Sequence, residues 1–123
     1  MTVIRAADAP RFSLPGVEFT GLAAPSRGSA DICTWRLTVA PSRDRPEPHT
    51  LDKDEVFMVI SGSVRVTPDG PELGTGDAMV VPAGSPIALV NTGDTAAELY
   101  VAIRAGFVGT MADGTTVRPP WAQ

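Results

Sequence analysis

The side chains best suited to chemistry in this chain are those of His49 and Glu55. His49 is the only histidine among 123 residues, and Glu55 opens the apolar run that ends at Gly62. A histidine and a carboxylate at the mouth of a strand can bind a metal, move protons, or serve as ordinary polar groups at a strand end. If they form an acid–base dyad, the carboxylate fixes the imidazole tautomer and raises its basicity. In that hypothesis His49 is the general base and Glu55 orients it.

The segments that must position these two residues are short and lie between recurrent turn signals. They are rich in Val, Ile and aromatic residues, which is typical of buried or half-buried strands. The predicted strands span residues 32–40, 56–62, 63–67, 77–82, 87–91 and 98–103. Short strands separated by Gly and Pro favour an all-β antiparallel sandwich or barrel. The length and the 43% hydrophobic content predict one domain over residues 1–123.

The strand from Val56 to Ile60 is apolar on both of its faces. A small barrel covers only the inner face, so the outer face has to meet a second sheet, a folded-back arm or another subunit. We expect a homodimer, in which residues 1–20 form an N-terminal arm or a strand exchanged between subunits.

Composition excludes several classes of partner. The net charge is −4 and the ten basic residues are scattered along the chain, so we expect no nucleic acid partner. No stretch approaches the ~18 consecutive apolar residues of a membrane span, and the first residues lack the apolar core of a secretory signal. The single cysteine, Cys33, cannot form an internal disulfide. The sequence therefore predicts a protein of the reducing cytoplasm, with no membrane partner.

The spacing around His49 and Glu55 resembles the two sequence motifs of the cupin superfamily. The first motif, G-x5-H-x-H-x3-4-E-x6-G, is matched by His49, Glu55 and Gly62, whereas Arg43 replaces its opening glycine and Leu51 its second histidine. The second motif, G-x5-P-x-G-x2-H-x3-N, is matched except at its histidine, which is Ile87 here. Its matched residues are Gly76, Pro82, Gly84 and Asn91.

The resemblance implies a cupin fold, an antiparallel double-stranded β-helix or jelly-roll barrel. It also implies a dimer in which N-terminal strands pack across to the partner. The apolar side chains of the arm that suit this contact are Phe12, Leu14, Val17 and Phe19.

The resemblance further implies what the site lacks. In metal-binding cupins the two histidines and the glutamate of the first motif, with the histidine of the second, hold a transition metal. Leu51 and Ile87 stand at two of those four positions, and aliphatic side chains cannot ligate. His49 and Glu55 leave two ligands where a catalytic metal usually has at least three. We therefore predict no metal and no cofactor.

Without a metal, the barrel interior becomes a pocket with apolar walls and one polar pair. We expect the substrate-binding side chains to be those that point inward: Trp35, Leu51, Phe57, Val59 and Ile87. Such a pocket is typical of a site for a small apolar ligand or one of mixed polarity. The same side chains could instead fill the barrel and close the cavity, since small barrels are often packed solid.

Two classes of function follow from this reading. The first is a metal-independent isomerase, cyclase or dehydratase with His49 as general base and Glu55 as its orienter. The resemblance permits this role, because some metal-independent cupins move protons with a histidine supported by a carboxylate. The second is a non-catalytic ligand-binding or sensing cupin with a packed or apolar barrel, in which His49 and Glu55 are structural.

Overall fold

The computed structural model describes residues 1–42 and 44–123, so Arg43, the residue at the first motif's opening position, lies outside the described residues. The described residues form twelve strands and two short 3-10 turns. The strands are β1 (Arg11–Leu14), β2 (Val17–Gly21), β3 (Ile32–Val39), β4 (Thr50–Leu51), β5 (Glu55–Ser61), β6 (Val64–Arg65), β7 (Glu72–Leu73), β8 (Ala78–Val81), β9 (Val90–Asn91), β10 (Ala97–Arg104), β11 (Gly109–Thr110) and β12 (Thr116–Val117), and the turns are η1 (Pro25–Arg27) and η2 (Pro120–Ala122).

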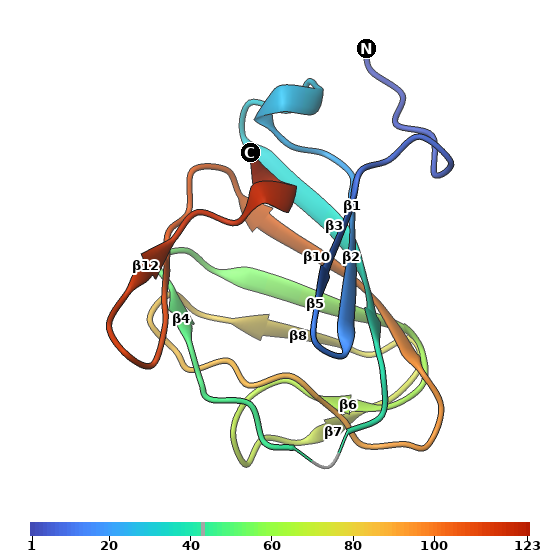
Figure 1. Cartoon of the computed structure of the whole chain (residues 1–123), viewed down its shortest axis with the longest axis vertical. Coiled ribbons are helices and arrows are strands. Elements are labelled where there is room, and N and C mark those ends of the chain that lie inside the picture. The colour runs from blue at the N-terminus through green and yellow to red at the C-terminus, as the bar shows by residue number, and fades with distance from the viewer. Residues whose placement is uncertain (43) are drawn as a thin grey trace.

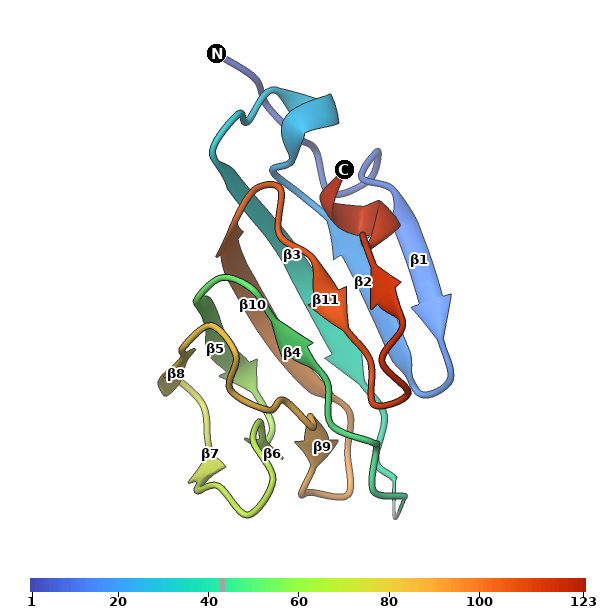
Figure 2. The ribbon, with the colours of Figure 1, turned by 90° about the vertical axis from the view of Figure 1, so that its left-hand side faces the viewer.

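The strands form one large sheet and two small ones, shown in Figure 1. The large sheet has the order β1-β2-β3-β10-β5-β8, and the small sheets have the orders β12-β11-β4 and β7-β6-β9. Every strand pair among the described residues is antiparallel. In Figure 2, β4 and β11 lie in front of β3 and β10, so the chain has two facing layers. The predicted all-β antiparallel barrel of jelly-roll type is thereby confirmed.

The long strands of the large sheet show the alternation that a half-buried strand requires. In β3 the side chains of Cys33, Trp35, Leu37 and Val39 are buried, and the side chains between them are half-buried. β5 and β10 repeat the pattern and contribute Phe57, Val59, Leu99 and Val101 to the same core. The inward-facing set predicted from β3 and β5 is therefore correct.

Residues 11–21, part of the expected arm, form a hairpin on the chain's own sheet. β1 pairs with β2, and β2 pairs with β3. Pro15 and Gly16 connect β1 to β2, and Gly16 has a φ of +76°. A proline followed by a residue of positive φ is the pattern of a type II turn, so the sequence Leu-Pro-Gly-Val carries the hairpin signal.

Two turn residues of the predicted motifs have the expected roles. Gly62 has a φ of +84°, and a Cβ atom there would lie 2.9 Å from the Ala97 backbone, so only glycine fits between β5 and β10. The Asn91 side chain accepts a hydrogen bond from the Gly93 N–H at 2.8 Å and donates to the carbonyls of Val39 and Thr95. Asn91 therefore holds the turn after β9 and ties it to the end of β3.

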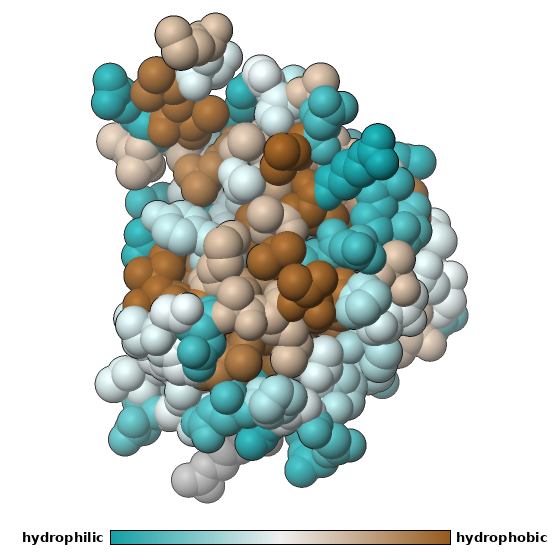
Figure 3. Space-filling model, turned by 180° about the vertical axis from the view of Figure 1, so that it is seen from behind, coloured by the Kyte–Doolittle hydropathy of each residue, from teal (hydrophilic) through white to brown (hydrophobic). Residues whose placement is uncertain are grey.

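The outer face of the large sheet stays partly apolar and uncovered within one chain. Met58 on β5, Val80 on β8 and Tyr100 on β10 are all exposed, and Tyr100 lies opposite Met58 in the strand register. In the view from behind, apolar side chains gather in the middle of the visible face (Figure 3).

The helices among the described residues are the two 3-10 turns, and neither is long enough to cross a membrane.

Candidate functional site

A cavity of about 880 Å³ lies between the layers of the barrel. It is lined by side chains of the large sheet, among them Trp35, Leu37 and Phe57, and by Leu51 and Ile87 from the facing side. The barrel is therefore not packed solid with side chains. A cavity of this size is in the range of sites for small organic molecules, ~300–1,000 Å³.

The structure brings most of the predicted site residues together around this cavity. The lining includes both polar residues of the predicted site, His49 and Glu55, and four of the five predicted apolar ones. Those four are Trp35, Leu51, Phe57 and Ile87. Val59 is buried in the core but is not among the residues that line the cavity.

His49 lies in the layer that faces the large sheet, and its backbone is held there by hydrogen bonds. It immediately precedes β4, and its backbone forms an isolated antiparallel bridge with Ile87. The His49 N–H donates to the Ile87 carbonyl at 3.0 Å, and the Ile87 N–H donates to the His49 carbonyl at 2.8 Å. Residues bonded in this way are direct neighbours on one face of a sheet. Ile87 therefore places an aliphatic side chain beside the imidazole.

Glu55 comes from the opposite layer. It is the first residue of β5, where it lies across from Ile103 on β10 and Val81 on β8. Its side chain is buried, with 4% of its surface exposed, and its Oε2 atom has no hydrogen-bond partner among the described residues. Burial raises the pKa of Glu55 to about 8 because an unpaired carboxylate is poorly solvated there. At neutral pH Glu55 is therefore a carboxylic acid.

His49 and Glu55 share the cavity, but their side chains form neither a hydrogen bond nor an ion pair with each other. Arg36 and Glu98, on the outer face of the large sheet, form the single ion pair found in residues 1–42 and 44–123. Burial alone lowers the pKa of His49, so no carboxylate stabilises its cationic form. Glu55 is therefore not placed to orient His49 by a hydrogen bond, and the two side chains face the cavity as a neutral base and a neutral acid.

The side chains that line the cavity do not match the metal ligands expected from the two sequence motifs. Within the described part of the chain, no three His, Cys, Asp or Glu side chains are grouped to hold a metal ion. Leu51 and Ile87 occupy the positions of the missing ligands and line the cavity with hydrocarbon. A donor set of one imidazole and one buried, protonated carboxyl is too small for a catalytic metal.

Sequence reasoning missed several side chains that line the cavity. Phe107 follows β10, and Trp121 lies in η2 near the C-terminus, in segments with no strand pattern. Phe12 and Phe19 were expected to pack on a partner subunit, but they line the cavity of their own chain. The one sequence signal that could have pointed to these four residues is that aromatic side chains are rare in this chain, at 6% of the sequence.

The C-terminal turn η2 is fastened to the rest of the chain by hydrogen bonds. The Arg27 guanidinium donates to the Trp121 carbonyl at 2.9 Å, and to the Leu22 carbonyl through Nε. The Cys33 thiol donates to the Ala122 carbonyl at 3.4 Å. Trp121 stacks on Phe19 with ring centres 3.8 Å apart. Trp121 is therefore a fixed part of the cavity wall.

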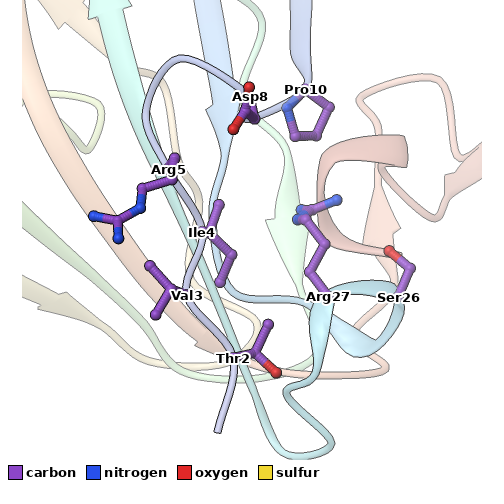
Figure 4. A pocket seen from close by; sticks show the side chains of 8 residues that line it. All are labelled: Thr2, Val3, Ile4, Arg5, Asp8, Pro10, Ser26 and Arg27. Carbon is purple, nitrogen blue, oxygen red and sulfur yellow. The ribbon is translucent and has the colours of Figure 1, made fainter.

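A second hollow of about 340 Å³ lies between the N-terminal segment and η1. Figure 4 shows Arg5 pointing away from Arg27, and within the described lining neither arginine forms an ion pair with Asp8. Arg27 already donates to the carbonyls of Leu22 and Trp121. The barrel cavity, with its acid and its base, is therefore the candidate site.

Comparison with known sequences agrees with this fold. Residues 35–103, more than half of the chain, match the sequence family described as a cupin domain. The match spans β3 to β10 and so includes His49, Leu51, Glu55 and Ile87. No curated protein matches the chain.

Solved structures with the same fold include both an enzyme and a 7S globulin. The polyketide cyclase RemF from Streptomyces resistomycificus has a TM-score of 0.73 at 20% identity, over 85% of this chain and 79% of that one. KdgF from Halomonas sp. has a TM-score of 0.65 at 17% identity, over 80% and 89%. The 7S globulin of Momordica charantia has a TM-score of 0.72 at 21% identity, over 91% of this chain and 38% of that one. At these identities the likeness shows the fold alone.

Proposed function

Because the chain belongs to the cupin family, we propose that it binds a small apolar or mixed-polarity molecule in its barrel and catalyses proton transfer on it without a metal. The reaction classes are those of an isomerase, cyclase or dehydratase. The observation that carries the proposal is the pair of neutral groups in one apolar cavity, His49 as base and Glu55 as acid. Environments that shift the pKa values of two groups in opposite directions are typical of acid–base sites.

The proposed chemistry begins with a ligand that carries a carbonyl group. A neutral nitrogen of His49 takes a proton from the carbon next to the carbonyl. The C–H electron pair becomes a C=C bond, and the π pair of the C=O bond moves onto the oxygen. The Glu55 carboxylic acid donates its proton to that oxygen, which gives an enol, an imidazolium and a carboxylate. In the second step the Glu55 carboxylate takes back the enol proton. The imidazolium gives its proton either to a different carbon of a conjugated enol, which yields an isomer, or to the oxygen of a second carbonyl of the ligand that the enol carbon attacks, which yields a cycle. Both groups are then restored.

The fold supports this arrangement because the two groups come from opposite layers. His49 stands before β4, and Glu55 begins β5, so a flat ligand between the layers would meet one group on each side. The fold shared with the polyketide cyclase RemF is compatible with this class of reaction. Glu55 is thus assigned as a proton donor in place of the orienting role predicted from the sequence.

Exchange of hydrogen for deuterium tests the proposal without knowledge of the natural substrate. The probe is 2-tetralone, an apolar ketone whose protons next to the carbonyl are acidic. Incubated in D2O with the protein, it should gain deuterium faster than in buffer alone, measured by mass spectrometry. His49→Gln should bring the rate back to that of buffer, and Glu55→Gln should slow it by roughly 100-fold, in line with loss of one general acid.

Glu72→Gln is the matched control, because Glu72 lies exposed on β7 and outside the cavity. It should leave the exchange rate unchanged. If the wild type and His49→Gln exchange 2-tetralone at the same rate while both bind it, the catalytic proposal is wrong. The alternative, a ligand-binding or sensing cupin, would then be the better account of the same cavity.

We also propose that the protein is a homodimer, with a second copy covering the outer face of the large sheet. The support is the exposed apolar side chains of Met58 and Val80 on β5 and β8, the strand pair at the end of that sheet. A cytoplasmic location stays a prediction, and its support is the single cysteine, Cys33, which is buried and free.

A further inference from the structure

The cavity gathers nearly all the aromatic residues of the protein. The sequence contains four phenylalanines, two tryptophans and one tyrosine. All four phenylalanines and both tryptophans line the cavity: Phe12, Phe19, Trp35, Phe57, Phe107 and Trp121. Tyr100, the remaining aromatic residue, lies exposed on the outer face of the sheet. A core that only needed to be filled would not require this segregation, since aliphatic residues form most of the core.

These rings come from separate segments and meet around the cavity. Trp121 of η2 stacks on Phe19 of β2, and its ring lies edge-on to Trp35 of β3 at 6.3 Å between centres. Trp35 also stacks with Phe107, with 6.0 Å between ring centres and 29° between the ring planes. Rings at these distances and angles offer both faces and edges, which are the surfaces that another aromatic ring contacts favourably.

The polar groups of the lining restrict the charge of a ligand. Among the described residues that line the cavity, Arg118 is the one with a permanent positive charge, and its side chain is exposed. Glu47 is also exposed, whereas the groups farther inside are His49 and the buried Glu55. An anionic group placed deep in this cavity would lose its water and find no cation, which is strongly unfavourable. The deep cavity therefore favours an uncharged ligand.

Donors without partners point to an oxygen on that ligand. The indole N–H groups of Trp35 and Trp121 are buried and have no acceptor among the described residues. Buried indole N–H groups usually find a partner. A ligand oxygen in the cavity supplies an acceptor, either for one of these N–H groups or for the proton of the Glu55 carboxyl.

We propose that the natural ligand is an uncharged, flat molecule of two or more fused aromatic rings that carries a hydroxyl or carbonyl oxygen. The ring system lies against the walls formed by Trp35, Phe107 and Trp121, and the oxygen lies toward Glu55. This inference rests on the proposed function for the position of the oxygen, but the aromatic wall supports it independently.

Three probes with one carbon skeleton test the ligand class by isothermal titration calorimetry. They are 2-naphthol, which is flat and uncharged at pH 7; decahydro-2-naphthol, which is puckered and saturated; and 2-naphthoate, which is flat and anionic. Two or three additional ring contacts should make 2-naphthol bind at least ~5-fold more tightly than decahydro-2-naphthol. The missing cation should weaken 2-naphthoate by at least a similar factor.

Variants of the wall separate aromatic contact from general hydrophobicity. Phe107→Leu and Trp121→Leu should each weaken 2-naphthol binding by roughly fivefold, the loss of one ring contact, and affect decahydro-2-naphthol less. Tyr100→Leu, on the outer face, should change neither. If a leucine variant fails to fold, Trp121→Phe keeps a ring and should retain most of the preference for 2-naphthol.

The result that would overturn the ligand class is equal or tighter binding of decahydro-2-naphthol, or no binding of 2-naphthol. Calorimetry requires no turnover, so its outcome is separate from that of the exchange experiment. Preference for the saturated probe would leave proton transfer by His49 intact. Tight binding of 2-naphthol without deuterium exchange on 2-tetralone would keep the ligand class and remove the catalysis.

Discussion

The two titratable side chains of the cavity act on stability in opposite directions. The pKa of Glu55 is raised to about 8 by burial, so the folded protein holds a proton that the unfolded chain loses near its ordinary value of 4.5. Stability linked to Glu55 is complete below pH 4.5 and is lost as the pH rises toward 8. The pKa of His49 is lowered by burial, so stability linked to His49 is present above pH 6.5 and is lost at lower pH. Above pH 6.5 the slope from His49 fades, and the slope from Glu55 dominates up to pH 8.

We predict that the free energy of unfolding falls by about 1–1.5 kcal/mol between pH 6.5 and 8. The slope is at most about 1.4 kcal/mol per pH unit, it flattens as the pH nears 8, and the remaining slope of His49 opposes it. Glu55→Gln should remove this slope, because glutamine is neutral throughout and has nearly the same volume. Urea unfolding at pH 6.5, 7.25 and 8 measures it. Glu72→Gln, at an exposed position, should keep the slope of the wild type. Equal slopes in the wild type and Glu55→Gln would mean that Glu55 is ionised in the folded protein.

The sequence predicted the cavity residues whose positions the motif spacing fixes. It did not predict the cavity residues that the C-terminal segment contributes. His49, Leu51 and Ile87 could be predicted because motif spacing sets their strand positions, and all three line the cavity. Phe107 and Trp121 could not, because their places depend on how the C-terminal segment returns across the barrel. The absence of a bond between His49 and Glu55 also lay beyond the sequence, since two residues close in the chain lie on opposite layers.

At the scale of the elements, the strands that contain an apolar run were predictable, and most of the two-residue strands were not. β3, β5, β8 and β10 lie within one residue of the predicted segments at each end, because alternating or continuous apolar runs specify them. β4, β7, β11 and β12 contain two residues each, which is too short for a periodic pattern. The β1–β2 hairpin had a local signal, the turn at Pro15 and Gly16, but the segment was expected to be an arm.

The β1–β2 turn gives a prediction about stability. Gly16 has a φ of +76°, and an added Cβ atom would meet nothing within 4 Å, so Gly16→Ala introduces backbone strain without a clash. We expect it to lower the free energy of unfolding by about 1 kcal/mol. Gly74→Ala is the control, because Gly74 lacks a positive φ and its nearest contact would be 3.9 Å away. It should change stability by less than about 0.5 kcal/mol, and equal losses in the two variants would contradict the turn assignment.

At the scale of the whole molecule, the large sheet has one face that encloses the cavity and one that a single chain leaves uncovered. The β1–β2 hairpin extends this sheet beside β3 and does not cover the outer face at β5 and β8. Val80 on the edge strand β8 is 61% exposed, and it lies opposite Val56 in the register. Exposed apolar side chains grouped in this way are typical of a surface that meets another protein.

The proposed homodimer predicts a mass near twice the 12.8 kDa of one chain in sedimentation at micromolar concentration. Val80→Lys should convert the dimer to a monomer, because an ammonium group cannot be buried without a partner in an apolar interface. It should cost the fold little, about 0.5 kcal/mol or less, because the side chain is exposed in the single chain. Val3→Lys is the control, since Val3 is also exposed but lies in the N-terminal segment away from the sheet. A wild-type monomer, or a dimer that survives Val80→Lys, would show that a second copy does not cover this face.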